Sequence, residues 1–369
     1  MLMDNNVEKT SLYNWHRENS NNIVSFSGFL LPVYYSGIVD EHLSVRKNAG
    51  LFDVSHMGEF IISGKAAEKF LQLVTVNDVS KLRKGQAQYT AICDNNGGII
   101  DDIIIYKKEH TFMMVVNASN IDKNFQWLKS VIIDGAEIDD ISQNCDMIAI
   151  QGPASRKILQ SNINEDISSL IFYHFIDKID FLGNEILLSR TGYSGELGYE
   201  IYCSPDATTD IWRALIESGR RDGLVAAGLG CRDTLRLEMN YLLYGNDINQ
   251  KINPIEAGLS WITKLNKGHF IGKNKIIEKN NSVIKCLFSF IMLDKAIPRA
   301  GYSIIYNGEV VGSVTSGTMS PSLNKGIGMG YIDISCNAIG NKINIDVRGK
   351  LKEAQIVNPP FYKNGSLHS

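Results

Sequence analysis

The sequence lacks both an excess of basic charge and a long apolar run. Its 369 residues carry a formal net charge of −3, with 37 Lys and Arg against 40 Asp and Glu. Nucleic-acid-binding domains cluster Lys and Arg on a positive background, so this balance argues against that class of protein. No apolar run reaches the roughly 18 residues that a membrane-spanning helix needs. We therefore expect no nucleic-acid partner and no membrane segment.

Targeting signals and paired cysteines are lacking as well. The segment "MLMDNNVEKTSLY" (1–13) is polar with early acidic residues, unlike a secretory signal or an Arg-rich transit peptide. Six cysteines are scattered along the chain without a C-x-x-C pair: Cys93, Cys145, Cys203, Cys231, Cys286 and Cys336. This spacing is typical of neither a zinc ribbon nor a disulfide framework. It indicates reduced thiols and a cytoplasmic location.

Common catalytic and metal-binding motifs are missing. There is no G-x-S-x-G nucleophile elbow and no Walker motif. The seven histidines show no metal-ligand spacing, so we expect no bound metal. His56 lies near Asp53 in "LFDVSHMGE". Because a lone His in mixed sequence is more often structural than a ligand, we interpret His56 as structural.

One segment comes close to a dinucleotide-binding fingerprint. In "LVAAGLGCRDTLRLE" (224–238), a short apolar strand is followed by Gly228, Gly230 and a predicted helix. The third glycine of the fingerprint is replaced by Asp233, and no ribose-binding acid follows about twenty residues later. The segment therefore does not predict a dinucleotide site. A helix N-terminus with Arg232 beside it is still a reasonable anion site.

Helices and strands alternate through the first 260 residues. The length predicts two or three domains. "SNIDKNFQWLKSV" (119–131) predicts a helix, because Ser119 lies three residues before Asp122 at the spacing of a capping box. One face of that helix is apolar: Ile121, Phe125 and Leu128. "SPDATTDIWRALIESG" (204–219) predicts a second helix, with Ser204 as its N-cap.

The pattern changes near residue 266. Residues 266–281 are rich in Lys and Asn, and we interpret them as a linker. Short alternating runs with turn signals follow, and Asn307-Gly308 in "IIYNGEVVG" is a strong hairpin signal. The last ~85 residues therefore predict a small all-β domain.

Two adjacent aspartates interrupt a run of isoleucines in "NNGGIIDDIIIYK" (95–107). Such a run predicts a buried strand, where an unpaired charge costs several kcal/mol, roughly. Alternate strand residues share a face. One face then carries Ile100, Asp102, Ile104 and Tyr106, and the other carries Ile99, Asp101, Ile103 and Ile105.

A second strand, "TFMMVVN" (111–117), is predicted to pair with the first. If Lys107 pairs with His110, Ile100 lies opposite Asn117, and Asn117 joins the face of Asp102. A loop with one residue more or fewer would move Asn117 to the far side. The polar patch fits either an exposed strand end or a carboxylate aimed into a ligand cavity. Strand geometry alone does not separate these interpretations.

Six segments occur in an order that resembles one protein family. They are "EHLSVRKNAGLFDVSHMGE", "KGQAQYTAICDNNGGIIDDIIIYK", "MVVNASNIDKNFQWL", "SRTGYSGELGYEIY", "GLGCRDTLRLEMNYLLYGNDI" and "NPIEAGLSWITKLNKGHFIGK". Together they resemble the T proteins of the glycine cleavage system, which are aminomethyltransferases. The likeness runs from about Thr10 to the C-terminus.

The resemblance implies an α+β fold of three lobes arranged like a cloverleaf around a central folate site. It implies a folate-binding catalytic region over residues 8–270, made of two intertwined α+β lobes. A C-terminal β-barrel domain over residues 282–363 would form the third lobe.

The resemblance also implies an activity. The methylene of an aminomethyl group on the lipoyl arm of H protein passes to tetrahydrofolate. The products are 5,10-methylenetetrahydrofolate, ammonia and dihydrolipoyl H protein. Tetrahydrofolate is then the co-substrate, lipoylated H protein is the direct partner, and the P and L proteins are indirect partners.

The site residues implied by the resemblance include the catalytic aspartate Asp102. The implied folate contacts are Tyr89, Tyr106, Asn117, Tyr193, Glu200, Arg232 and Tyr241. Asp102, Tyr106 and Asn117 are also the face derived above from strand geometry.

The implied roles suit the chemistry of these side chains. A carboxylate such as Glu200 accepts two adjacent pterin N–H groups, and a guanidinium such as Arg232 binds the carboxylates of the glutamate tail. Tyrosines offer flat apolar walls with a polar rim. Asp102 orients the attacking folate nitrogen, favours the cation that develops and accepts its proton. Asp101 points elsewhere and is interpreted as structural.

The sequence departs from the family at a few positions. Phe29 and Leu30 stand where the family tends to have Trp and an acid, and either Phe361 or Tyr362 takes the place of an aromatic that contacts the folate tail. Two other functions remain open. One is a folate-dependent demethylase of a methylated amine or sulfonium compound, and the other is a folate sensor without catalysis.

Overall fold

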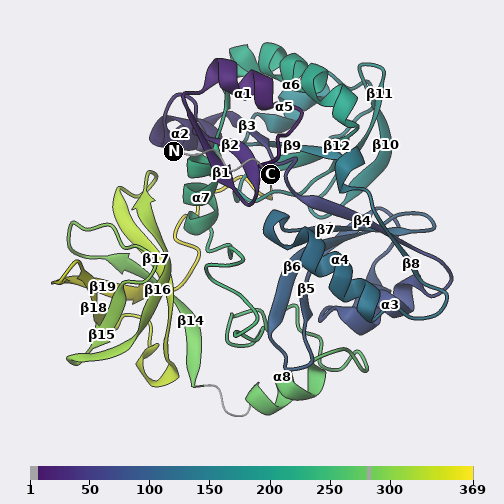
Figure 1. Ribbon diagram of the computed structural model, residues 1–369. Helices are drawn as coiled ribbons and strands as arrows, with labels where there is room; N and C mark the ends of the chain where they lie inside the picture. The colour runs from purple at the N-terminus through teal and green to yellow at the C-terminus, as the bar shows by residue number, and fades with distance from the viewer. Residues whose placement is uncertain (1–6, 281–283, 369) are drawn as a thin grey trace.

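Three lobes surround a common centre in the computed structural model, which describes residues 7–280 and 284–368 (Figure 1). The first lobe is built on a six-stranded sheet, the second on a five-stranded sheet, and the third is a closed six-stranded barrel. The predicted α+β architecture of three lobes with a C-terminal barrel is confirmed.

The first lobe contains a sheet of order β10-β11-β12-β9-β3-β13. Its strands are β3 (Ala49–Asp53), β9 (Asp146–Gln151), β10 (Phe175–Phe181), β11 (Asn184–Ser189), β12 (Gly198–Cys203) and β13 (Leu224–Ala226). The lobe also holds the hairpin of β1 (Asn22–Phe26) and β2 (Phe29–Tyr34). Its helices are α1 (Tyr13–Asn19), α2 (Ile38–Lys47), α5 (Ser155–Gln160), α6 (Pro205–Gly219), α7 (Leu229–Glu238) and the short 3-10 turn η4 (Arg220–Asp222).

Helix α6 follows the sequence prediction closely. It begins at Pro205, with Ser204 in the N-cap position, and ends at Gly219. The Ser204 hydroxyl makes no capping hydrogen bond. The first turn of the helix is therefore stabilised by the fixed φ of Pro205 and by the packing of the buried helix face. Trp212 is fully buried in the core that α6 and α5 form with the sheet.

The second lobe contains a sheet of order β5-β6-β7-β4-β8. Its strands are β4 (Gly58–Ser63), β5 (Gln86–Cys93), β6 (Ile99–Lys107), β7 (Phe112–Val116) and β8 (Glu137–Asp140). Its helices are α3 (Ala67–Val74), α4 (Ile121–Ser130) and the 3-10 turns η1 (Val79–Lys81), η2 (Ala118–Asn120) and η3 (Ser142–Asn144). One sheet face packs on α3 and α4, and the other packs on the sheet of the first lobe.

The start of α4 differs from the prediction. The 3-10 turn η2 precedes the helix, Asn120 takes the N-cap position, and no side chain caps it. Ser119 is exposed within that turn, so the predicted capping box is wrong. The Asn120 side chain donates instead to Asp101, 2.7 Å away. The predicted apolar face is confirmed, since Ile121, Phe125 and Leu128 pack on the sheet.

The predicted linker over 266–281 is folded against the second lobe, so that interpretation is wrong for the described positions; residue 281 lies outside them. Phe270 and Ile276 are fully buried, the latter in α8 (Lys273–Asn280). Lys267 Nζ donates to the backbone carbonyls of Thr75 and Asn77, each at 2.6 Å. The Lys and Asn content misled the prediction because backbone carbonyls bind the half-buried Lys267 ammonium, while the remaining Lys and Asn side chains of the described segment are half-buried or exposed.

The C-terminal lobe is a closed barrel of order β14-β17-β16-β15-β18-β19, which confirms the all-β prediction. Its strands are β14 (Lys285–Met292), β15 (Ser303–Tyr306), β16 (Glu309–Ser320), β17 (Lys325–Asp333), β18 (Lys342–Val347) and β19 (Lys350–Val357), with the 3-10 turn η5 (Ile334–Cys336). Asn307 and Gly308 join β15 to β16 with φ of 51° and 86°, as a type I′ hairpin turn requires.

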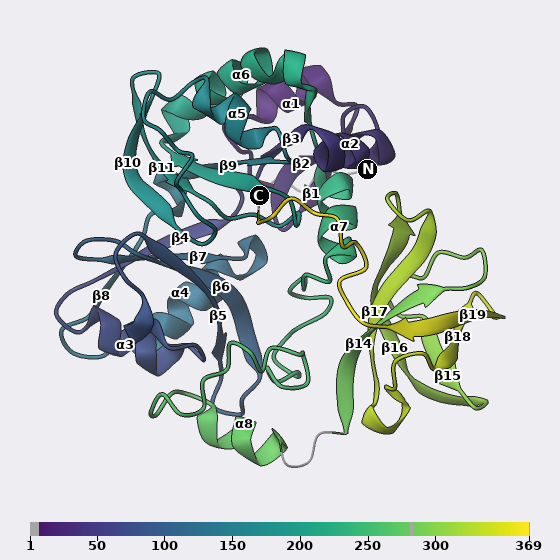
Figure 2. The ribbon, with the colours of Figure 1, turned by 180° about the vertical axis from the view of Figure 1, so that it is seen from behind.

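The segment after β19 returns from the barrel to the first lobe (Figure 2). The backbone N–H groups of Phe361 and Tyr362 donate to the carbonyl of Glu238 on α7, at 2.9 and 3.0 Å. The Arg46 guanidinium lies 4.2 Å from the centre of the Tyr362 ring. These contacts fix the barrel beside the first lobe.

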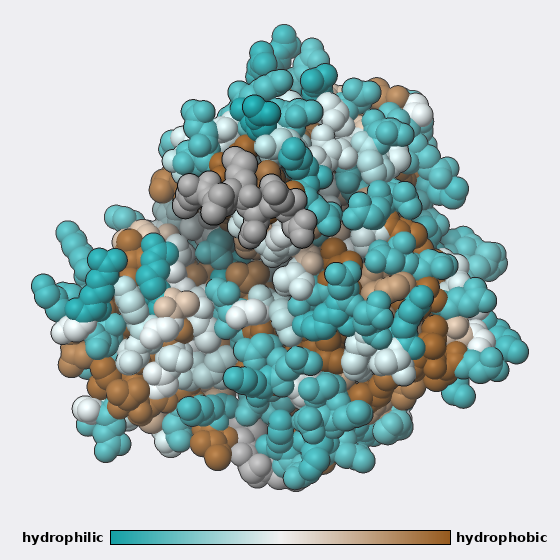
Figure 3. Space-filling view, viewed as in Figure 1, coloured by the Kyte–Doolittle hydropathy of each residue, from teal (hydrophilic) through white to brown (hydrophobic). Residues whose placement is uncertain are grey.

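Most of the face seen in Figure 3 is hydrophilic, with apolar residues in separate small groups.

Candidate active site

A cavity of about 950 Å³ lies where the three lobes meet. The second lobe contributes β5, β6 and the residues after β7, while the first lobe contributes β12, α7 and the loop after β3. The barrel contributes Leu287, Phe288 and Ser289 of β14. The volume is in the range of small-molecule sites, and its place between lobes is typical of them.

The hairpin of β6 and β7 has a different register from the predicted one. Lys107 pairs with Phe112 and Ile104 with Val115, so residues 108–111 form the turn and the predicted Lys107–His110 pairing is wrong by two residues. Because an even shift keeps each residue on its face, Asn117 still joins Asp102. The Asn117 amide Nδ2 donates to Asp102 Oδ1 at 2.9 Å.

A bulge at the start of β6 corrects one more assignment. Ile92 pairs with Asp101 and Cys93 with Ile99, which leaves Ile100 as an extra residue. An extra residue reverses the alternation of faces before it. Ile100 therefore packs with Ile103 and Ile105 against α4, and not on the face of Asp102 as predicted.

Asp102 borders the cavity and has partners on both carboxylate oxygens. Tyr89 donates from its hydroxyl to Oδ2 at 3.0 Å, and Asn117 donates to Oδ1. Burial raises the pKa of Asp102 above its ordinary value, while these two hydrogen bonds act in the opposite direction. The carboxylate is thus held in place with its reactive side open to the cavity.

Asp101 has the opposite environment on the other face of β6. It is fully buried and does not border the cavity. Its carboxylate accepts from the backbone N–H and Nδ2 of Asn117 and from the side chains of Asn120 and Asn124. Four donors compensate for the lost hydration. The predicted orientation of Asp101 away from the site is confirmed.

Glu200 and Arg232 are two residues of opposite charge on the cavity wall. Glu200, on β12, accepts a hydrogen bond from the Thr191 hydroxyl. Burial raises the pKa of Glu200, and the positive charge of Arg232 opposes this shift. Burial likewise lowers the pKa of Arg232, and the charge of Glu200 opposes it. Glu200 on β12 pairs with Ala149 of β9, and Ala149 pairs in turn with Phe52 of β3. Phe52 and Arg232 border one small void, so the two charged side chains lie at the same end of the cavity.

Arg232 has no fixed anionic partner in the described part of the chain. Of the two nearby acids on α7, Asp233 pairs with Arg236, and Glu238 pairs with Arg46. The guanidinium lies 4.7 Å from the centre of the Tyr193 ring. Its hydrogen-bond donors therefore remain available to a ligand.

Aromatic rings form the flat walls of the cavity. Tyr193 and Tyr241 stack with ring centres 5.6 Å apart, and Tyr89 and Trp261 stack at 6.0 Å. All four rings border the cavity. Tyr89, which the sequence left unplaced, pairs with Ile104 and so shares the face of Asp102.

Tyr106 is the one predicted folate contact that does not border the cavity. Its ring is fully buried, and its hydroxyl lies 3.0 Å from the Tyr202 hydroxyl and 3.3 Å from Thr191 Oγ1. Thr191 in turn donates to Glu200. The structure thus places Tyr106 behind the wall, where it supports the position of Glu200 through Thr191.

The aromatic residues of the C-terminal tail also lie away from the cavity. Phe361 packs in the core beneath it, and Tyr362 lies against Arg46, so neither borders the site. Asn358 and Pro359 border it instead. Phe29, one of the positions that depart from the family, packs on the His56 ring at a distance of 6.3 Å.

Several cavity residues were missed by the sequence analysis. Phe26 and Ser27 reach the cavity from the β1–β2 turn, and Trp261 reaches it from the segment before α8. Trp261 stands in a quoted family segment and could have been found there. The turn carries no chemical signal of its own. His56 was interpreted as structural, yet it borders the cavity.

The fold and the site together define a class of protein: a three-lobed α+β enzyme with a central small-molecule site. The sequence matches two family models, the GCVT N-terminal domain over residues 12–267 and the glycine cleavage T-protein C-terminal barrel domain over residues 285–363. The chain therefore belongs to the glycine cleavage T-protein family.

Curated relatives match over nearly their whole length. An aminomethyltransferase of Chloroherpeton thalassium is 47% identical over 363 residues, covering 97% of this chain and 100% of that protein. One of Bacillus subtilis is 44% identical over 360 residues, covering 97% and 99%. The crystal structure of the glycine cleavage system aminomethyltransferase T from Bartonella henselae is similar at 28% identity, with a TM-score of 0.90 over 97% of this chain and 99% of that one.

The described ranges contain neither a membrane-spanning helix nor a metal-binding cluster. Across residues 7–280 and 284–368, no helix is long and apolar enough to cross a membrane. Within the same ranges, no three His, Cys, Asp or Glu side chains come together as a metal site would need.

Proposed function

We propose that this protein is a tetrahydrofolate-dependent aminomethyltransferase of the glycine cleavage system. It transfers the methylene of an aminomethyl group, carried on the lipoyl arm of H protein, to tetrahydrofolate. The products are 5,10-methylenetetrahydrofolate, ammonia and dihydrolipoyl H protein. The observation that carries this proposal is Asp102, a half-buried carboxylate held by Tyr89 and Asn117 at the wall of a cavity of ligand size.

The wall residues fit the chemistry of a folate. Glu200 accepts the paired N–H donors on the pterin edge, and the stacked rings of Tyr193 and Tyr241 match the flat faces of the ligand. From the sequence, Arg232 was expected to bind the glutamate tail. Because Glu200 and Arg232 lie at one end of the cavity, we propose that both serve the pterin end. Tyr106 acts through Thr191 without touching the ligand.

Asp102 acts on the attacking nitrogen of the folate. A carboxylate beside that nitrogen accepts a hydrogen bond from its N–H group and stabilises the positive charge that grows as it attacks the methylene carbon. The same oxygen accepts the proton released in the reaction. Tyr89 and Asn117 fix the carboxylate, so its free lone pairs face the ligand. The carbon gains bonds to both N5 and N10 of the folate as its bonds to the amine and to the lipoyl sulfur break. The two N–H protons that the folate loses end on ammonia and on the dihydrolipoyl thiol.

The partners follow from this reaction. Lipoylated H protein delivers the aminomethyl group, while the P and L proteins act on that carrier at other stages. We assign the catalytic region to residues 8–270 and the barrel domain to residues 282–363. Residue 282, where the barrel domain is proposed to start, lies outside the described residues. A cytoplasmic location remains a prediction from the sequence.

A coupled assay tests the proposal. Lipoylated H protein loaded with the aminomethyl group is mixed with this protein, with and without tetrahydrofolate, and the release of ammonia is measured. We expect rapid release that depends on both the protein and tetrahydrofolate. Release that is equally fast without either one contradicts the proposal. The same assay with a methylated amine or sulfonium donor tests the demethylase alternative.

A further inference from the structure

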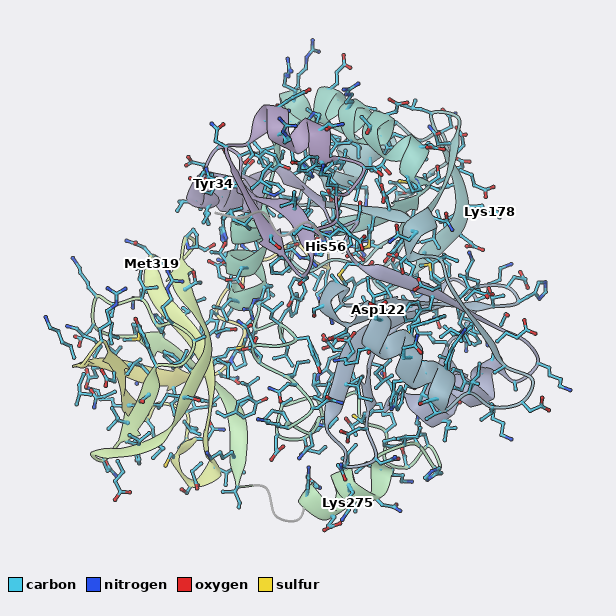
Figure 4. The ribbon with its side chains drawn as sticks, in the orientation of Figure 1. Tyr34, His56, Asp122, Lys178, Lys275 and Met319 are labelled. Carbon is cyan, nitrogen blue, oxygen red and sulfur yellow. The ribbon has the colours of Figure 1, made fainter. Side chains whose placement is uncertain are left out.

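His56 is a buried imidazole whose polar atoms the proposed mechanism does not use. It lies in the loop between β3 and β4, at the end of the first lobe that faces the centre of the molecule (Figure 4). Only 3% of the residue is exposed, and it borders the cavity beside Met57. The rings of Phe26 and Phe29 pack on it at 5.8 and 6.3 Å. The ring is thus fixed by packing at a ligand-facing wall.

The nitrogens of His56 lack partners in the protein. Nδ1 is enclosed and has no hydrogen-bond partner among the described residues, and Nε2 has no bond to a described residue either. Burial and the charge of Arg232 lower the pKa of His56 to about 4, so the ring is neutral near pH 7. A neutral imidazole carries one N–H donor and one acceptor nitrogen.

The environment decides which nitrogen carries the proton. A buried N–H without a partner is rarer and more costly than an acceptor without one. Nδ1 is the enclosed atom, so the acceptor lone pair belongs there and the proton belongs on Nε2. Nε2–H is then a donor, and the cavity is the open space that the ring borders. Arg232 lies at the same end, because it borders a small void together with Asp53, the last residue of β3 before the loop that carries His56.

This end of the cavity therefore presents an acceptor next to donors. Glu200 is the acceptor, while His56 Nε2 and the Arg232 guanidinium are donors. A pterin offers the complementary edge: an amino group and a ring N–H that donate, followed directly by the carbonyl oxygen at position 4, which accepts. A neutral donor beside a carboxylate matches that sequence of groups.

We propose that His56 donates a hydrogen bond from Nε2 to the 4-oxo group of the pterin and thereby selects 4-oxo over 4-amino folates. The inference rests on the proposed function, because it names the group of the folate, the 4-oxo group of the pterin, that His56 recognises. His56 is a specificity-determining residue, and it takes no part in the transfer step.

Calorimetry with two ligands tests the proposal. Affinities for tetrahydrofolate and for its 4-amino analogue are measured with the wild type and with His56→Phe, which keeps a flat ring but has no donor. We expect the wild type to prefer the 4-oxo ligand. His56→Phe should lose about tenfold affinity for that ligand, the effect of roughly one hydrogen bond, and little affinity for the 4-amino ligand. His110→Phe, in the exposed turn after β6, is the matched control and should keep the wild-type ratio.

Two further variants separate the donor from the shape. His56→Gln carries an amide N–H and should retain part of the preference, whereas His56→Leu should lose it and replaces the Phe variant if that does not fold. Thermal melts report folding in each case. An unchanged ratio in folded His56→Phe or His56→Leu, or a Gln variant no more selective than Leu, overturns the proposal. A wild type that binds neither ligand overturns the proposed function itself, which is a distinct result.

Discussion

Asp101 and Asp102 are neighbours on one strand, but the two faces of β6 give them different surroundings. Asp101 is enclosed on the α4 side and accepts four hydrogen bonds from Asn117, Asn120 and Asn124. Asp102 accepts bonds from Tyr89 and Asn117 and borders the cavity. Burial raises the pKa of both carboxyl groups.

The comparison shows that burial alone does not identify a catalytic carboxylate. The number and origin of the donors separate the two residues. The carboxylate oxygens of Asp101 accept hydrogen bonds only from groups of the protein, and these bonds connect β6 to α4. Asp102 accepts fewer hydrogen bonds from the protein, so lone pairs of its carboxylate remain free for a ligand. Asn117 links the two, because its Nδ2 donates to both carboxylates. The variants below test this division.

The largest effect is expected from Asp102→Asn. The amide keeps the shape of the side chain but loses the charge and the ability to accept a proton. Aminomethyl transfer should fall by roughly a hundredfold to ten-thousandfold, the usual range for a positioned acid–base group. Turnover numbers of Asp102→Asn and Asp101→Asn in the coupled assay check this, beside thermal melts and folate titration. A dead Asp101→Asn with a nearly normal Asp102→Asn would mean that the roles of the two faces are reversed.

Asp101→Asn should show its cost in stability and keep most of the rate. An amide at this position turns one of its own N–H groups toward donors that need an acceptor. Leaving such buried groups unpaired costs about 1–3 kcal/mol. The free energy of unfolding, measured with denaturant, checks the estimate. Stability equal to the wild type would show that the donors around Asp101 are not compensating for its burial.

Arg232→Lys tests the other end of the cavity. Lysine keeps the charge but cannot present the planar fork of donors, so we expect folate affinity to fall by about tenfold. Calorimetric titration measures it. Arg213→Lys, on the exposed side of α6, is the control and should bind as the wild type does. Unchanged affinity in Arg232→Lys would place Arg232 among the structural residues, with Asp101.

Tyr89→Phe should have the smallest effect on the maximal rate, within a few-fold, and a clear effect on its pH dependence. Catalysis uses the carboxylate form of Asp102, so activity is lost as pH falls through its raised pKa. The Tyr89 hydrogen bond lowers that pKa, and removing it raises the pKa further. The acid limb of the turnover profile should therefore move to higher pH. Tyr306→Phe on the barrel should leave the pH of half-maximal turnover unchanged. If this pH were the same in Tyr89→Phe and Tyr306→Phe, the hydrogen bond from Tyr89 to Asp102 would be contradicted.

Part of this site could be predicted from the sequence. The two-residue period of a strand correctly separated Asp101 from Asp102, and it placed Asn117 with Asp102 although the assumed register was wrong by two residues. The bulge at Ile100 was not predictable, because it depends on the pairing of β5 with β6. The family segments supplied Tyr89, Tyr193, Glu200, Arg232 and Tyr241, which all border the cavity.

The rest depends on tertiary contacts. Glu200 and Arg232 stand 32 residues apart, and only the packing of β12, β3 and α7 shows that they share one end of the cavity. Tyr106 is on the predicted face of its strand, but packing of the two sheets buries it behind the wall. His56 has no local signal, since its proposed role depends on the β1–β2 hairpin that packs on it and on the cavity that it borders.

The structure of the complex with tetrahydrofolate tests the central claim most directly. The quantity to measure is the distance from the Asp102 carboxylate oxygens to the nearest folate ring nitrogen. We predict hydrogen-bonding distance, about 2.7–3.2 Å, with the pterin between Tyr193 and the Glu200–Arg232 end. A folate bound in the cavity with Asp102 out of reach of any of its nitrogens, or a folate bound outside the cavity, would contradict the account.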